Sequence, residues 1–286
     1  MRIINRLFVT GVTVLLAVSL LTACGGKEER KAKYLERGKA YLAEKNYDKA
    51  KIEFKNVLQI DPKSAEGYLY LGQVEEKEQS WARVFGNYQK AIELDPDLIE
   101  PRIRLAKFYL AQASALRARD DEKGAANAMG LVQEQLKEIQ TREPENLEGL
   151  TLEATLSIND GDVDKAMERL EHVVQKDPGL QSAAALLASI YDQKGRVDDA
   201  EAILVTAAQT NTDPVVLQQR LAQFYRKHKK NDQAEKVLRN IVSNNPNELG
   251  YRVSLASFLA QTEQLEKAEE LLRDTIAEDP QDAQRY

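Results

Sequence analysis

Residues that could carry chemistry are few in this chain of 286 residues. It holds one cysteine and two histidines, which excludes an intrachain disulfide framework and a multi-thiolate metal site. His172 and His228 stand far apart in the sequence, so we interpret each as a surface or half-buried side chain rather than a ligand. The sequence contains no glycine-rich phosphate loop, HExxH motif or GxSxG motif. It therefore predicts a protein without enzymatic activity, bound metal or cofactor.

One group of acids has the spacing of a calcium loop. Asp160, Asp162, Asp164 and Glu171 occupy positions 1, 3, 5 and 12 of such a loop. The sixth position needs glycine for its sharp turn, but this chain has Lys165, whose charge also repels a cation. We therefore interpret the four acids as solvated side chains near a turn.

The only cysteine, Cys24, closes an N-terminal targeting pattern. Arg2 and Arg6 make the start of the chain positive, and the apolar run Leu7–Leu21 has 15 residues, fewer than the about 20 that span a bilayer. The sequence LTAC that follows resembles a bacterial lipobox. The resemblance implies a signal peptide of residues 1–23, diacylglycerol attached to the Cys24 thiol, and acylation of the new amino terminus, with palmitate-type chains.

The residues after the cysteine, Gly25 and Gly26, bear on the destination. By resemblance to Gram-negative lipoproteins, the absence of an aspartate there implies an outer-membrane lipoprotein that faces the periplasm. The net charge of −6 becomes more negative once Arg2 and Arg6 are removed, which argues against nucleic acid or anionic lipid as the main partner. The alternative is an ordinary secretory signal with a coincidental cysteine, or a free buried thiol.

Composition and proline spacing predict a helical repeat array. With 14 glycines, 8 prolines and 6% aromatic residues, the chain has too few turn and aromatic residues for an all-β fold. Seven of the prolines are spaced by 34, 48, 34, 36, 32 and 34 residues: Pro62, Pro96, Pro144, Pro178, Pro214, Pro246 and Pro280. The spacing of 48 is 34 plus an insertion of 14, which we place at about residues 112–127.

Two positions of the repeat alternate in size. Position 8 is always small: Gly38, Gly72, Ala106, Ala154, Ala188, Ala222 and Ala256. Position 24 is always large and apolar: Phe54, Tyr88, Leu136, Leu170, Leu204, Leu238 and Leu272. Small residues opposite large ones allow two antiparallel helices to interlock at the density of a protein interior.

This unit resembles the tetratricopeptide repeat. The resemblance implies an all-α, right-handed solenoid of antiparallel helix pairs, with a continuous core and a concave groove. Seven units are expected, at 31–64, 65–98, 99–146, 147–180, 181–214, 215–248 and 249–282. A short tether, 24–30, would precede the array of residues 31–282, and residues 283–286 would begin an eighth unit.

Basic residues near the groove face of the first helix of some units are candidates for partner binding: Lys39, Arg104, Lys107, Arg226 and Lys227. They could capture an acidic peptide or a C-terminal carboxylate. The alternative is a solvated face without a ligand. The insertion is expected to lengthen both helices of the third unit with a bend near Gly124, and either contacts a partner or is merely tolerated.

The end of the chain is expected to expose apolar side chains: Leu265, Leu271, Leu272 and Ile276. Because the terminal unit of a solenoid needs a cover, we expect that the chain is the start of a longer protein, or that this end docks on a partner or a second copy. A frayed terminal helix with a tolerated apolar patch is the alternative.

The function indicated is a non-enzymatic scaffold for protein interactions, anchored to the envelope, with no small-molecule substrate. The chain resembles the tetratricopeptide lipoproteins that assist pilus biogenesis, exopolysaccharide secretion and exosortase (PEP-CTERM) sorting, and the segment from Gly38 to Gly72 looks most like the last. The alternatives are an adaptor or regulator of a periplasmic cell-wall hydrolase, and the N-terminal adaptor of a longer protein.

Overall fold

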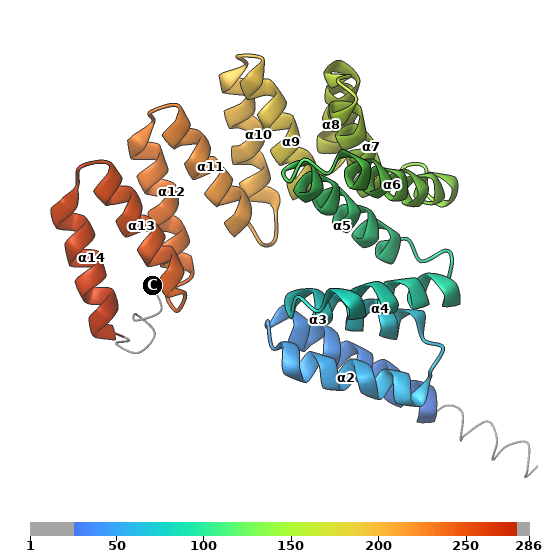
Figure 1. The fold of residues 1–286 in the computed structure, drawn as a ribbon. Coiled ribbons are helices and arrows are strands. Elements are labelled where there is room, and N and C mark those ends of the chain that lie inside the picture. Colours follow the sequence, from blue (N-terminus) through green and yellow to red (C-terminus); the bar gives the residue numbers. More distant parts are fainter. Residues whose placement is uncertain (1–25, 279–286) are drawn as a thin grey trace, which may run out of the picture. The chain divides into compact units, whose positions relative to one another are not determined.

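The computed structural model describes residues 26–278, and in this range all regular secondary structure is helical (Figure 1). The first helix spans residues 26–43. The others are α2 (Tyr47–Ile60), α3 (Ala65–Lys77), α4 (Trp81–Leu94), α5 (Glu100–Arg117), α6 (Glu122–Arg142), α7 (Leu147–Asn159), α8 (Val163–Lys176), α9 (Gln181–Gln193), α10 (Val197–Thr210), α11 (Val215–Lys227), α12 (Asn231–Asn244), α13 (Leu249–Gln261) and α14 (Leu265–Glu278). The all-α class and the helix pairs of the repeat are therefore confirmed.

The chain divides into two compact units, one ending at Pro144 and the other beginning at Glu145. The N-terminal unit contains the first three helix pairs. In the C-terminal unit, α8 packs on α9, α10 on α11 and α12 on α13, so the second helix of each pair contacts the first helix of the next. One hydrophobic cluster runs through this unit from Ala154 in α7 to Ala268 in α14. Stacking thus gives the C-terminal unit a single core.

The described part of the expected tether is helical. Residues 26–30 are helical and continue into the first helix. Lys31 Nζ lies 2.7 Å from a carboxylate oxygen of Glu28, and Arg30 Nε donates to the carbonyl of Gly26 at 3.0 Å. These contacts three and four residues apart stabilise a helical turn. Residues 1–23, Cys24 and residues 283–286 lie outside the described residues.

Every turn between the two helices of a pair has one residue at positive φ: Lys45, Gln79, Asp120, Gly161, Gly195, Lys229 and Glu263. These residues are 34 apart, except around Asp120, where both spacings are 41. The insertion therefore adds seven residues on each side of this turn, close to two full turns of helix at 3.6 residues per turn. As a result α5 has 18 residues, against 13 in α3, and α6 has 21, against 14 in α4. Because whole turns are added, the apolar faces of α5 and α6 keep their register.

The sequence predicted that the third pair bends near Gly124, but the bend lies four residues earlier. The chain turns at Asp120, whose φ is 60°, and α6 has begun by Glu122. Asp121 caps this helix, because its side chain accepts a hydrogen bond from the Gly124 N–H at 2.9 Å. The capping residue Asp121 therefore marks the start of α6, and Gly124 lies inside the first turn of this helix.

The small residues at position 8 are where the two helices of a pair meet most closely. A Cβ atom on Gly72 would stand 2.4 Å from the ring of Tyr88, and one on Gly38 would stand 2.4 Å from the ring of Phe54. Both rings are fully buried. Glycine is therefore required at these two crossings by space, not by backbone conformation.

Gly72→Ala should lower the free energy of unfolding by about 1–3 kcal/mol, because the added methyl group would stand 2.4 Å from the buried ring of Tyr88. The matched control is Gly86→Ala, in the interior of α4, where an added Cβ would meet no atom within 4 Å. Alanine there should stabilise the protein by about 0.5–1 kcal/mol, through helix propensity. Thermal unfolding of both variants measures whether the two changes in the free energy of unfolding have opposite signs. Changes of the same sign would contradict the close contact assigned between Gly72 and Tyr88.

Candidate functional site

The basic residues predicted to bind a partner fall in both units. In the N-terminal unit, Lys39 Nζ lies 5.0 Å from the centre of the Tyr70 ring and 3.4 Å from a carboxylate oxygen of Glu36. Lys107 is exposed on α5. Arg104 is tied to two carboxylates, at 2.9 Å from Glu76 on α3 and 2.8 Å from Glu100 on its own helix. Its charge is already balanced, so Arg104 serves mainly to join α3 to α5.

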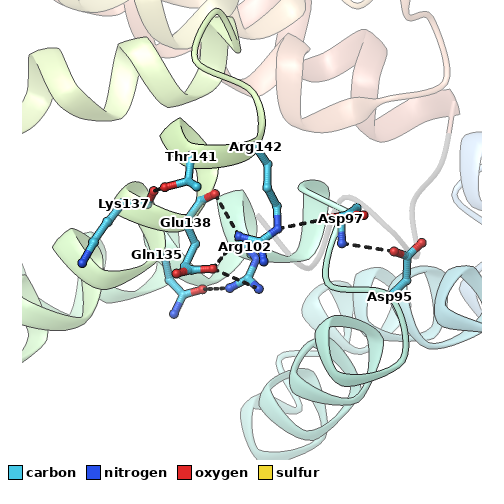
Figure 2. A network of polar contacts seen from close by, with 8 residues as sticks. All are labelled: Asp95, Asp97, Arg102, Gln135, Lys137, Glu138, Thr141 and Arg142. Carbon is cyan, nitrogen blue, oxygen red and sulfur yellow. Dashed lines mark hydrogen bonds and ion pairs between the residues drawn. The ribbon is translucent and has the colours of Figure 1, made fainter.

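A buried arginine, Arg102, is the centre of a polar network in the same unit (Figure 2). The residue is only 7% exposed, and its Nη1 donates to Gln135 Oε1 at 3.4 Å. Its Nη2 lies 3.8 Å from Glu138, which also accepts from Arg142. Burial, and next the charge of Arg142, lower the pKa of Arg102. Arg142 in turn reaches Asp97 at 3.2 Å, so the network joins α5, α6 and the loop before α5.

A second buried charge, Glu75, replaces the tyrosine found at position 11 of several units. It is 2% exposed and lies 3.0 Å from Lys51 Nζ and 2.6 Å from Arg83 Nε. Burial alone would raise the pKa of Glu75, but the hydrogen bonds from Arg83 and Lys51 hold it below its usual value. This cluster joins α2, α3 and α4 and has a structural role.

The C-terminal unit presents an open groove along the first helices of its pairs. One pocket lies between α9 and α11, and a second between α11 and α13; both include Gln223 and Lys227. The first pocket is also lined by Ala185, Ser189, Asp192 and Arg220, and the second by Arg226, Phe258 and Gln261. Small, amide and basic side chains thus share one continuous surface.

An ion cluster at the end of α11 holds this groove together. Lys227 Nζ donates to Asp192 Oδ2 at 2.6 Å, and His228 Nε2 lies 2.7 Å from Asp192 Oδ1. Asp192 is on α9 and its side chain is 11% exposed, whereas that of Lys227 is 63% exposed. Burial alone would raise the pKa of Asp192, but the hydrogen bonds from Lys227 and His228 outweigh this, so the pKa is lowered. The cluster joins α9 to α11 and leaves most of the Lys227 side chain in solvent.

Two arginines complete the positive surface. Arg226 donates to Gln261 Oε1 of α13 at 2.6 Å and lies 6.0 Å from the centre of the Phe258 ring. Arg220 is exposed and has no hydrogen bond or ion pair within residues 26–278. Arg226 and Lys227, two of the predicted residues, therefore line one groove, and Arg220, which the sequence analysis did not single out, lines it as well. Its signal in the sequence is the absence of acids between Asp213 and Asp232.

The acids of the calcium-like pattern have other contacts. Asp162 caps α8 by accepting from the Lys165 N–H, Asp164 pairs with Lys194 at 2.8 Å, and Glu171 accepts from the Tyr191 hydroxyl at 2.7 Å. Within residues 26–278, the structure has no group of three or more histidine, cysteine or acidic residues placed to hold a metal ion.

The sequence matches the tetratricopeptide-repeat family over residues 34–64, and again over the overlapping stretches 157–221, 193–254 and 225–286. Together these matches cover more than half of the chain. The chain is a tetratricopeptide-repeat protein. Proteins of this family act as scaffolds that bind other proteins or peptides. No curated protein sequence matches this tetratricopeptide-repeat chain significantly.

Solved structures share the fold at low identity. PilF of Pseudomonas aeruginosa is 20% identical with a TM-score of 0.50, and the match covers 81% of this chain and 99% of that one. Human IFIT1, solved with m7Gppp-AAAA, is 18% identical with a TM-score of 0.61, covering 86% and 58%. A chain of the APC/C Cut9–Hcn1 hetero-tetramer is 16% identical with a TM-score of 0.57, covering 83% and 42%. This tetratricopeptide-repeat chain thus spans about half the length of the last two.

Asp192→Asn should lower the free energy of unfolding by about 1 kcal/mol at neutral pH, because Lys227 and His228 lose a charged acceptor. Since the pKa of Asp192 is lowered in the folded state, its contribution is present above the unfolded-state pKa. That contribution is lost as the pH falls through the folded-state value. Denaturant unfolding at several pH values should show the variant and the parent converging in acid.

The matched control for this change is Asp164→Asn, because the Asp164 side chain is 82% exposed in its pair with Lys194. Exposed ion pairs contribute little, so this variant should unfold like the parent at every pH. An equal loss in both variants would show that the Asp192 cluster has no special role.

Proposed function

We propose that this protein is a non-enzymatic scaffold for protein interactions, anchored by lipid on Cys24 to the outer membrane and facing the periplasm. The observation that carries the scaffold role is the array of tetratricopeptide repeats with an open groove along α9, α11 and α13. The lipobox-like LTAC sequence and the single cysteine support the anchor. Within residues 26–278, no helix is long and apolar enough to cross a membrane.

The pathway that best fits this scaffold is the assembly or secretion of a cell-surface system. This chain combines a lipobox-like start with a repeat array, as do the lipoproteins of pilus, exopolysaccharide and exosortase systems. The similarity to PilF, which extends over 99% of that chain, accords with this class. Crosslinking in intact envelopes followed by purification of the scaffold tests the pathway. Recovery of a cell-wall hydrolase instead would favour an adaptor of that enzyme.

Cys24→Ser should release the protein from the membrane into the soluble periplasmic fraction, because two or three acyl chains hold a protein stably and the variant has none. Fractionation of envelopes, with a salt wash, measures this. The matched control is Ser80→Ala, far along the chain, which should remain with the outer membrane. If the Cys24→Ser protein still sediments with outer membranes after the wash, lipid is not the main attachment.

We further propose that α14 mediates self-association. Leu265 is 65% exposed, Ile276 55% and Leu272 38%, whereas Leu271 packs against the core. The residues equivalent to Leu272 in α8 and α10 are buried within stacked repeats. In an antiparallel pair of α14 helices, Leu265 of one copy lies opposite Ile276 of the other, with Leu272 near the two-fold axis.

Ile276→Lys should weaken this association, because it places a charge in the apolar stripe. Light scattering of the full chain carrying Cys24→Ser, over a range of concentrations, measures the molar mass. The matched control is Ile52→Lys on α2, since Ile52 is also exposed, at 59%, but lies outside the stripe. A parent chain that stays monomeric throughout would contradict the proposal.

A further inference from the structure

The helix α11 and the turn after it are strongly basic in an otherwise acidic protein. Between Asp213 and Asp232 the chain has no acid but five lysines and arginines: Arg220, Arg226, Lys227, Lys229 and Lys230. Lys227 pairs with Asp192 and Lys230 with Glu201. Within residues 26–278, the other three have no ion pair with a carboxylate. The positive charge of this helix is therefore balanced only in part by the protein itself.

Three side chains of α11 form a regular row in the pocket between α9 and α11. Arg220, Gln223 and Lys227 all line this pocket, at spacings of three and four residues, so they share one face of the helix. The Gln223 amide has no hydrogen-bond partner within residues 26–278. The row is thus an arginine, a free amide that can both donate and accept, and a lysine that is mostly in solvent.

The spacing of this row fits an extended peptide. Lys227 follows Arg220 by seven positions, which is about 10 Å along a helix at 1.5 Å per residue. An extended chain in the polyproline II conformation advances about 3.1 Å per residue with three residues per turn, so two side chains three residues apart lie on one face of the peptide, about 9 Å apart. The Gln223 amide between them is placed to bond with the peptide backbone.

We propose that the pocket between α9 and α11 binds an extended acidic segment of a partner protein, with two carboxylates three residues apart that meet Arg220 and Lys227. The inference rests on the proposed scaffold function and names the chemistry of its partner. Asp192 keeps Lys227 in position, because the lysine can donate to a second carboxylate while it remains bound to Asp192.

A protein segment fits this site better than a nucleic acid or a lipid surface. The pocket is small, about 220 Å³, and its remaining lining includes Ala185 and Ser189, which leave room for a backbone. The net charge of −6 repels a polyanion that must contact a wide surface, whereas a short acidic segment meets only the basic helix.

The test uses the full chain with Cys24→Ser and a fluorescein-labelled, end-capped peptide of sequence SESSES, measured by fluorescence anisotropy. Its two glutamates are three residues apart. The expected result is saturable binding that weakens with added salt, and that weakens about tenfold in Arg220→Gln and in Lys227→Gln. Lys236→Gln, an exposed cation lining a different pocket, is the matched control and should bind as the parent does.

Equal binding of the SQSSQS peptide, or unchanged binding in Arg220→Gln, would overturn the inference. Binding of an octameric RNA or of phosphatidylglycerol vesicles that competes with the peptide and needs Arg220 would also overturn it, and would assign the site to phosphates. Failure of the scaffold function itself has a separate readout, which is photocrosslinking in cells from a benzoylphenylalanine that replaces Ala185. A specific crosslinked partner that Arg220→Gln leaves unchanged would keep the scaffold and reject the acidic segment.

Discussion

The contact between position 8 of one helix and position 24 of its partner is the constraint on which this protein depends. At Gly72 and Gly38 the opposing ring leaves no room even for a methyl group. This close approach sets the distance between the helices of a pair, and the pair then offers one apolar face to the next. The seven residues inserted on each side of the turn between α5 and α6 obey the same constraint, because only an addition of whole turns keeps small and large residues opposed.

Where the repeat departs from its usual residues, paired charges take the place of apolar packing. Position 11 has Tyr191 and Tyr225, whose hydroxyls donate to Glu171 and Glu201. In the second repeat the same position has Glu75, with Lys51 and Arg83 as its partners. A buried charge is tolerated only with such partners, since an unpaired one costs several kcal/mol, about 3–5. These networks hold neighbouring helices in one arrangement.

The polar side chains that α11 contributes to the groove of the C-terminal unit are free to vary because they lie outside the core. The buried face of α11 consists of Leu217, Leu221, Ala222, Phe224 and Tyr225. The cations and Gln223 lie between these positions on the other face of the same helix. Their charge is therefore not fixed by packing, apart from that of Lys227, which joins α11 to α9 through Asp192. A scaffold can in this way acquire a specific partner by substitutions on the exposed face of one helix, while its core stays the same.

The sequence alone determined the repeat length, the helix pairs and the small-to-large pairing, because these follow from local periodicity and from side-chain volume. It also located Arg226 and Lys227 on the groove face, since that face follows from helical register. It could not show that Arg104 is neutralised by Glu76, that Asp192 on α9 anchors Lys227, or that Arg220 has no hydrogen bond or ion pair within residues 26–278. Those facts depend on which side chains of neighbouring helices come within about 3 Å of each other, and only the tertiary structure decides such distances.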